Sequence, residues 1–257
     1  MSLYKLYNHQ HFGDCFYTLQ YARKLCLANP EAEVHFFTRQ NRTELMAFLE
    51  PALRMRIQIL PHTALLNEAE AHDCWIGRED KRWLNKQPAP WMWDTMQYEF
   101  ARYLSEQMQV PCPYKSVRDV LFDSPQFELE TPLSKPVDYL IINGTPRSGQ
   151  FRYNGREFEE LITHLHQQGA SVVTTEQVSR DDVPCTRSYG INMVGIGNIA
   201  SYARNIIGVL TGPLHPCFNA WTIDKVERWM VLSSGESLTW NNRISQHTSV
   251  RAAQQHL

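Results

Sequence analysis

The sequence has no long apolar run, no excess of one charge and no paired cysteine motif, and each absence excludes a class of protein. A membrane-spanning helix needs about 20 consecutive apolar residues, and no such run occurs. The 25 basic and 27 acidic residues give a formal charge of -2, which offers no general attraction to nucleic acid or to anionic lipid. The N-terminus also lacks the basic-then-apolar order of a signal peptide. We therefore expect a cytoplasmic protein without a transmembrane segment.

Cysteine and histidine are too dispersed to indicate a disulfide framework or a metal cluster. The six cysteines contain no CxxC pair, which favours reduced thiols. A few histidines and cysteines stand two residues apart, but zinc takes four ligands in recognisable groups. The sequence therefore predicts neither a metal nor a cofactor.

The chain does contain apolar runs that alternate with helical patterns. Strands are predicted at 3–8 and 34–38, separated by a glycine-containing loop and a helix, which is the order of a right-handed βαβ unit. A second series begins with a strand at 139–143, a helix at 156–168 and a strand at 171–175. The two series predict an α/β protein.

The first helix is predicted to begin at Cys15 and to place Arg23 and Lys24 on a solvated face. Asp14 stands just before that start, where aspartate is a common N-cap. The same position follows Gly13 on the loop after the first strand, where a ligand could reach the carboxylate. Both roles are open from the residues alone.

A segment with three prolines and no sustained period, 122–136, indicates a linker. We place an N-terminal domain at 1–124, the linker at 125–136 and a C-terminal domain at 137–257. Before the linker, 75–114 carries many aromatic and basic residues. These would suit single-stranded nucleic acid, but the helical spacing that begins near residue 94 favours aromatic packing onto the first domain.

The segment 206–217, IIGVLTGPLHPC, combines a buried apolar run with a Thr-Gly-Pro turn. Such a run predicts a parallel strand, preceded here by a short helix for which Asn198 is the expected cap. Ligands of open α/β sheets bind beyond the carboxyl ends of the strands, where free N–H groups suit an anion. Thr211, Gly212 and His215 are therefore candidate phosphate contacts.

Three stretches resemble one family in order and approximate spacing. The segment 11–25 (HFGDCFYTLQYARKL) is similar to the glycine-aspartate loop and first helix of glycosyltransferase family 9, the ADP-heptose:lipopolysaccharide heptosyltransferases. The segment 142–165 resembles its threonine-rich basic loop, and 208–221 resembles its D-T-G-x-x-H turn. The resemblance implies a GT-B fold, with two Rossmann-like domains facing a cleft. The N-terminal domain would then be the acceptor side, and the C-terminal domain would bind the nucleotide sugar.

The sequence departs from the family pattern at two places. Leu210 stands where the family usually has aspartate before Thr-Gly, and Arg147 or Arg152 stands for its usual lysine. Both departures bear on the identity of the donor and on whether the protein is active.

The resemblance also implies a reaction and a set of site residues. A sugar would pass, with inversion, from a nucleotide-sugar donor (ADP-heptose or similar) to a glycan or lipid-linked glycan acceptor. Asp14 would be the general base. The donor would be held by Thr145, Arg147, Ser148, Arg152, Glu176, Thr211, Gly212, Pro213 and His215.

Each assignment has a plainer alternative. The arginines could be solvated, Glu176 could be an ordinary exposed residue, and His215 could be a packed histidine at a helix start. At the level of the whole protein, two other functions stay open. One is a catalytically silent nucleotide-sugar-binding protein, and the other is a sugar-nucleotide epimerase or hydrolase on the same fold.

Overall fold

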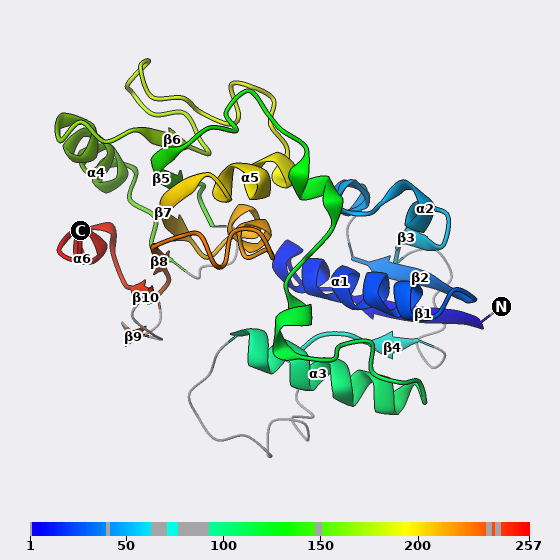
Figure 1. The fold of residues 1–257 in the computed structure, drawn as a ribbon. Helices are drawn as coiled ribbons and strands as arrows, with labels where there is room; N and C mark the ends of the chain where they lie inside the picture. The colour runs from blue at the N-terminus through cyan, green and yellow to red at the C-terminus, as the bar shows by residue number, and fades with distance from the viewer. Residues whose placement is uncertain are drawn as a thin grey trace. The chain divides into compact units, whose positions relative to one another are not determined.

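The computed structural model describes residues 2–39, 42–62, 71–76, 93–146, 151–234, 238–239 and 243–257. The chain divides into two compact units, Met1–Gln126 and Phe127–Leu257. Each unit contains a parallel sheet with helices packed against it (Figure 1). The predicted α/β class is therefore confirmed, and the division falls inside the segment 122–136.

The first unit has a four-stranded parallel sheet in the order β3-β2-β1-β4. The central pair forms the predicted βαβ unit, because the helix between the two strands returns the chain to the same edge. The elements are β1 Ser2–Asn8, α1 Phe12–Ala28, β2 Ala32–Thr38, η1 Thr43–Phe48, α2 Pro51–Arg54, β3 Ile57–Pro61, β4 His72–Asp73, α3 Trp93–Gln107 and η4 Val117–Val120; η5 Pro125–Glu128 spans the unit boundary.

Helix α1 differs from its prediction at its start and on its polar face. It begins at Phe12 with His11 as N-cap, three residues before the expected Cys15, so Asp14 lies inside the first turn and is not the cap. Arg23 is 3% exposed rather than solvated. Its guanidinium pairs with carboxylates of Glu50 and Asp123, which explains how a cation can lie in the core.

The proline-rich segment alternates buried and exposed residues. Phe122, Phe127 and Leu133 are all buried. The short helix η5 carries one of these side chains inward. The division between the units thus falls inside a segment that also contributes Phe122, Phe127 and Leu133 to the cores, while Leu129 is 59% exposed.

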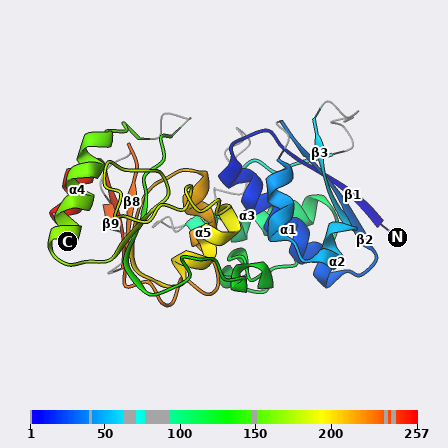
Figure 2. The same cartoon turned by 90° about the horizontal axis from the view of Figure 1, so that it is seen from above.

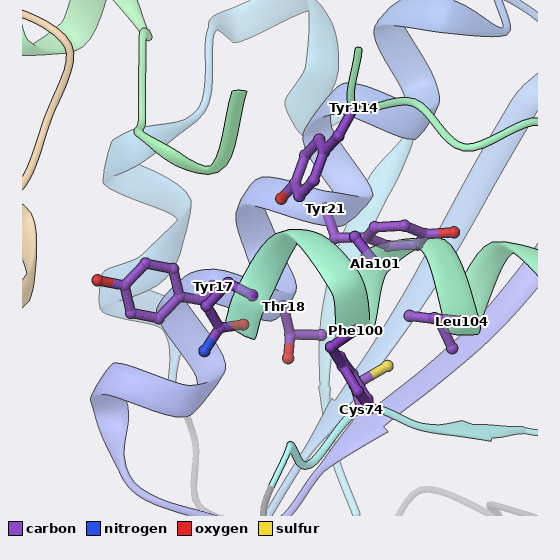
Figure 3. A pocket seen from close by; sticks show the side chains of 9 residues that line it. Tyr17, Thr18, Tyr21, Cys74, Phe100, Ala101, Leu104 and Tyr114 are labelled. Carbon is purple, nitrogen blue, oxygen red and sulfur yellow. The ribbon is translucent and has the colours of Figure 1, made fainter. Parts of the chain in front are cut away.

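Helices α1 and α3 pack against each other around a small cavity. In Figure 3, Thr18 of α1 lies beside Phe100 of α3, with Cys74 below them, and Tyr17 also lines the cavity. The cavity measures about 20 Å³, which is room for roughly one water molecule. It cannot hold a sugar or a nucleotide, so the site has to be sought elsewhere.

The second unit has a six-stranded sheet in the order β6-β5-β7-β8-β10-β9, parallel except for the last pair. The three predicted strands and the helix α4 are present with ends that differ by a few residues. The short helix expected after Asn198 lies earlier, at Met193–Ala200, and the sequence does not predict β8, β9, β10 or α6. The elements are β5 Val137–Ile142, α4 Gly155–Gln167, β6 Val172–Thr174, α5 Met193–Ala200, β7 Ala203–Val209, η6 Gly212–Cys217, β8 Arg228–Leu232, β9 Leu238–Thr239, β10 Ile244–His247 and α6 Val250–Gln254.

Alternate residues of these strands bury two separate cores, one on each face of the sheet. Ile142 and Ile206 face α5 and η6, together with Leu214. Ile141 and Ile207 face the opposite side, where α4 and α6 pack together. Figure 2 shows α4 and α5 on opposite sides of this sheet. Burial on both faces explains why the strands are continuous apolar runs.

Helix α5 is capped by Asn192, not by Asn198. The Asn192 side chain accepts a hydrogen bond from the N–H of Gly195 at 3.0 Å. Asn198 lies inside the helix, and its amide donates to the carbonyl of Phe127. At Gly197, a Cβ would lie 2.3 Å from the Phe127 ring, so the helix tolerates glycine there in exchange for close packing.

Several sequence predictions concern parts of the chain that are not described. The aromatic and basic residues within 77–92 belong to this group, as do Arg147 and Ser148. In the described ranges, no helix is both long and apolar enough to cross a membrane. Over the same ranges, no three metal-ligating side chains gather. All six cysteines are free thiols.

Candidate functional site

The carboxyl ends of the neighbouring strands β6, β5, β7 and β8 meet at one edge of the second sheet. Ile141 pairs with Thr174, Ile142 with Gly208, and Val209 with Leu232, so the strands end level with one another. The loops that follow therefore begin side by side. This edge is where ligands of open parallel sheets bind.

Asn143 fixes two of these strand ends to each other. It is 2% exposed, and its Oδ1 accepts hydrogen bonds from the N–H groups of Thr175 and Glu176 at 3.1 and 2.9 Å. Its Nδ2 donates to the carbonyl of Glu176 at 3.1 Å. Bonds to both sides of a buried amide give the loops after β5 and β6 a defined geometry.

Glu176 stands next to the loop after β5. A methyl group at Gly144 would lie 3.9 Å from its Cγ, and Thr145 is the exposed residue that follows. The Glu176 carboxylate accepts a hydrogen bond from Nη1 of Arg187 at 2.6 Å. The structure thus brings Glu176 near the Thr145 loop and adds a cation that the sequence prediction did not include.

The turn after β7 is anchored to the sheet by a buried side chain. Thr211 is the N-cap residue of η6, with Pro213 in its first turn. Leu214 is fully buried, and a Cβ on Gly208 would lie 2.8 Å from its Cδ1. A glycine inside a strand often indicates that another part of the chain approaches the backbone closely. Here the missing side chain lets Leu214 of the turn pack directly against the sheet. The predicted strand and turn are confirmed.

His215 is half-buried in η6. Burial lowers the pKa of its imidazole from 6.5 to about 4, because the charged form loses hydration. At neutral pH this side chain is therefore uncharged. It can donate one hydrogen bond to a phosphate, but it supplies no positive charge.

This shift makes folding stability depend on pH. Folded His215 stays neutral until about pH 4, whereas the unfolded chain takes up the proton near pH 6.5. The unfolded state binds more protons between these values, so the stability contribution falls as the pH is lowered from 6.5 to about 4. We expect wild type to lose urea resistance over this range more steeply than His215→Gln. Parallel pH profiles of the two midpoints would contradict the assignment.

The other predicted donor residues are placed less completely. Arg152 is exposed and precedes α4 by three residues. Arg147 and Ser148 lie outside the described residues. The structure therefore brings six of the predicted donor residues to loops at one edge of the sheet: Thr145, Glu176, Thr211, Gly212, Pro213 and His215. The assignment of Arg147 and Arg152 to the donor site depends on the sequence alone.

Asp14 occupies the equivalent place in the first unit, on the helix that follows β1. Burial raises the pKa of its carboxyl, while the His11 ring and the backbone N–H groups of Asp14 and His11 act in the opposite direction. Its own carbonyl accepts from the Thr18 hydroxyl at 3.1 Å, and Thr18 accepts from Asn8 at 3.0 Å. A half-buried carboxylate with a raised pKa is suited to take a proton.

Sequence reasoning missed Asn143 and Arg187. Asn143 directly follows a buried strand, which is a local signal for a polar residue at a strand end. Arg187 reaches Glu176 from 11 residues further along the chain, and no periodic pattern reports such a contact.

No protein-family model matches the sequence, and a search of curated proteins finds no match. Solved structures do match. The E. coli heptosyltransferase WaaC with ADP-2-deoxy-2-fluoro heptose gives a TM-score of 0.59 at 10% identity, covering 99% of this chain and 98% of that one. WaaC with ADP gives 0.56 at 13% identity, over 99% and 96%.

A third match is the iron-containing dodecameric glycosyltransferase TibC from enterotoxigenic E. coli. Its TM-score is 0.51 at 14% identity, and the match covers 90% of this chain but 57% of TibC. At these identities the likeness concerns the fold. The chain therefore has a fold like that of the heptosyltransferase WaaC, which agrees with the resemblance noted in its sequence.

Proposed function

We propose that this protein is a glycosyltransferase that moves a sugar, heptose or a related one, from a nucleotide-sugar donor to a glycan acceptor with inversion. The observation that carries the proposal is the level edge of β6, β5, β7 and β8, with Glu176 after β6 and Thr211 after β7, on either side of the loop that follows β5. It is supported by fold likeness to a heptosyltransferase whose structures contain ADP or an ADP-heptose analogue.

The donor would lie across this edge. Backbone N–H groups and hydroxyls at Thr145 and Thr211 would contact the diphosphate, and Glu176 would accept hydrogen bonds from the ribose hydroxyls. Arg147 and Arg152 would offset the charge that develops on the leaving nucleoside diphosphate. No metal is required if guanidinium groups supply that charge.

Asp14 would act from the first unit as the general base for the acceptor hydroxyl. Direct attack by that hydroxyl on the anomeric carbon breaks the bond to the diphosphate and inverts the configuration. The proposal includes a GT-B arrangement in which the two units face a common cleft. The acceptor would be a free glycan or a glycan linked to a lipid.

The proposal is tested by a thermal-shift screen against nucleoside diphosphates and nucleotide sugars, followed by product analysis. A ligand that binds the folded state raises the melting temperature by mass action. We expect ADP or an ADP-sugar to give the largest shift, and a transfer product to form only when an acceptor is present. Conversion of the donor without an acceptor would instead identify an epimerase or hydrolase.

Arg152→Ala or Arg147→Ala is expected to weaken nucleoside diphosphate binding by about 1.5–3 kcal/mol, the range for hydrogen bonds to charged groups. Isothermal titration calorimetry measures the change. Arg156→Ala is the matched control, because that side chain is 85% exposed on α4 and pairs with Glu160. Affinity that is unchanged in both test variants would reject the basic loop as the diphosphate site.

A second candidate, a silent nucleotide-sugar-binding protein, is favoured by Leu210. Its side chain packs against the core of the second unit, and its N–H donates to the carbonyl of Leu232 at 3.0 Å. An apolar side chain at this position can neither carry charge nor form the hydrogen bonds that an aspartate would form. Nucleotide binding without turnover for every donor and acceptor tried would select this function.

A further inference from the structure

Glu176 is fixed through both its backbone and its carboxylate. The Asn143 amide accepts from its N–H and donates to its carbonyl, at 2.9 and 3.1 Å. Arg187 donates to Oε2 at 2.6 Å. Within the described part of the chain, no hydrogen bond is made to Oε1, so one oxygen of a firmly placed carboxylate is open to a ligand.

Arg187 is itself carried by an anchored turn. The neighbouring Thr186 donates its N–H to the carbonyl of Thr174 at 2.8 Å and its hydroxyl to that of Thr175 at 3.3 Å. On the other side, the Ser188 hydroxyl donates to Oε1 of Gln177 at 2.8 Å. The guanidinium therefore reaches Glu176 from a backbone that is already held beside it.

The ion pair has little value for stability. The side chains of Arg187 and Glu176 are 75% and 41% exposed, and exposed pairs contribute about 0–1 kcal/mol. Its geometry has another consequence. An isolated carboxylate beside a diphosphate would repel it, whereas a carboxylate paired with arginine presents no net charge and still accepts hydrogen bonds from hydroxyls.

We infer that Arg187 is a positioning residue for ribose recognition: it occupies Oε2 of Glu176, turns Oε1 toward the hydroxyls of the nucleotide and cancels the carboxylate charge. This inference rests on the proposed function and adds to it a residue that sets the specificity for ribose. Glu176 makes the contact with the ligand, and Arg187 acts through Glu176.

The test compares binding of ADP and 3′-deoxy-ADP by titration calorimetry. We expect wild type to prefer ADP by about tenfold or more, since a hydrogen bond to a charged acceptor is lost with the deoxy compound. Glu176→Gln should abolish most of this preference, and Arg187→Ala should reduce it to about twofold. Arg187→Lys should restore part of it, because an ammonium can still pair with Oε2.

Arg204→Ala is the matched control. Arg204 and Glu227 also form an exposed ion pair, 3.0 Å long. This pair lies at the amino ends of β7 and β8, at the other edge of the sheet from the candidate site. This variant should keep the wild-type preference. The ratio of two dissociation constants from one preparation does not depend on the fraction of folded protein, so a loss of the preference cannot come from misfolding.

The outcomes separate the inference from the proposed function. Wild-type discrimination in Arg187→Ala would overturn the positioning role and leave nucleotide binding intact. Equal affinity of wild type for the two nucleotides would overturn the ribose contact as well. Failure of wild type to bind ADP, GDP, UDP or CDP would overturn the proposed function together with the inference.

Discussion

Asp14→Asn is expected to lower the rate of sugar transfer by about 10²- to 10⁴-fold, the usual contribution of a positioned acid or base. Asparagine has the same shape but cannot take the proton of the acceptor hydroxyl. Burial already raises the pKa of this carboxyl, which means that the fold favours its neutral form, so the neutral amide should cost little stability. Transfer rates and melting curves of the two proteins provide the comparison.

The pH dependence gives a second measurement of the same residue. Because the pKa of Asp14 is raised above 3.8, the base form is lost at a higher pH than for an ordinary aspartate as the solution is acidified. The transfer rate of wild type should fall over the same pH range. Asp14→Asn should bind the nucleoside diphosphate with the wild-type affinity. A variant that transfers sugar at the wild-type rate would assign Asp14 a structural role in the first turn of α1.

Arg23→Met is expected to lower the free energy of unfolding by about 3 kcal/mol, near the lower end of the range for breaking a buried ion pair. The Arg23 side chain is 4% exposed, and its Nε lies 3.0 Å from Oε2 of Glu50 and its Nη1 2.5 Å from Oδ1 of Asp123. The lower end is chosen because these carboxylates are 22% and 41% exposed and regain some hydration.

Urea unfolding followed by circular dichroism measures this loss. Arg102→Met in the same unit is the control, since Arg102 is 52% exposed and pairs with Glu99 at 3.3 Å; its substitution should cost no more than about 1 kcal/mol. Equal losses in the two variants would mean that the buried network adds nothing beyond a surface pair. Lys24 also binds Asp123, at 2.5 Å, so the double variant Arg23→Met, Lys24→Met should be less stable than either single one.

The features that could be predicted from the sequence are those with a local cause. The carboxyl halves of β5 and β7 are buried on both faces, and such strands appear in the sequence as runs of consecutive apolar residues. The turn at Thr211 and the helix α4 likewise follow from glycine, proline and a 3.6-residue period. The motifs at 142–165 and 208–221 lie in these parts of the chain.

The features that could not be predicted depend on partners that are distant in sequence. Arg23 was assigned to solvent because its partners lie 27 and 100 residues away. The sequence predicts a helix start at Asn198, whereas α5 begins at Met193; the close packing of Gly197 against the Phe127 ring depends on a residue 70 positions away. Asn143 and Arg187 act across the sheet edge, and no helical or strand period reports such contacts.

The turn at η6 also bears on the entropy of ligand binding. Its backbone contains Pro213 and Pro216, and its Leu214 and Cys217 side chains are fully buried. Most of the conformational freedom of this segment is therefore already lost when the protein folds. Under the proposed function, a phosphate bound at this turn would not have to order the loop, so more of its interaction energy would be available as affinity. Substitutions at Gly208 or Leu214, which pack against each other where the turn meets the sheet, should therefore weaken phosphate affinity. They would make the turn more flexible in the unbound protein.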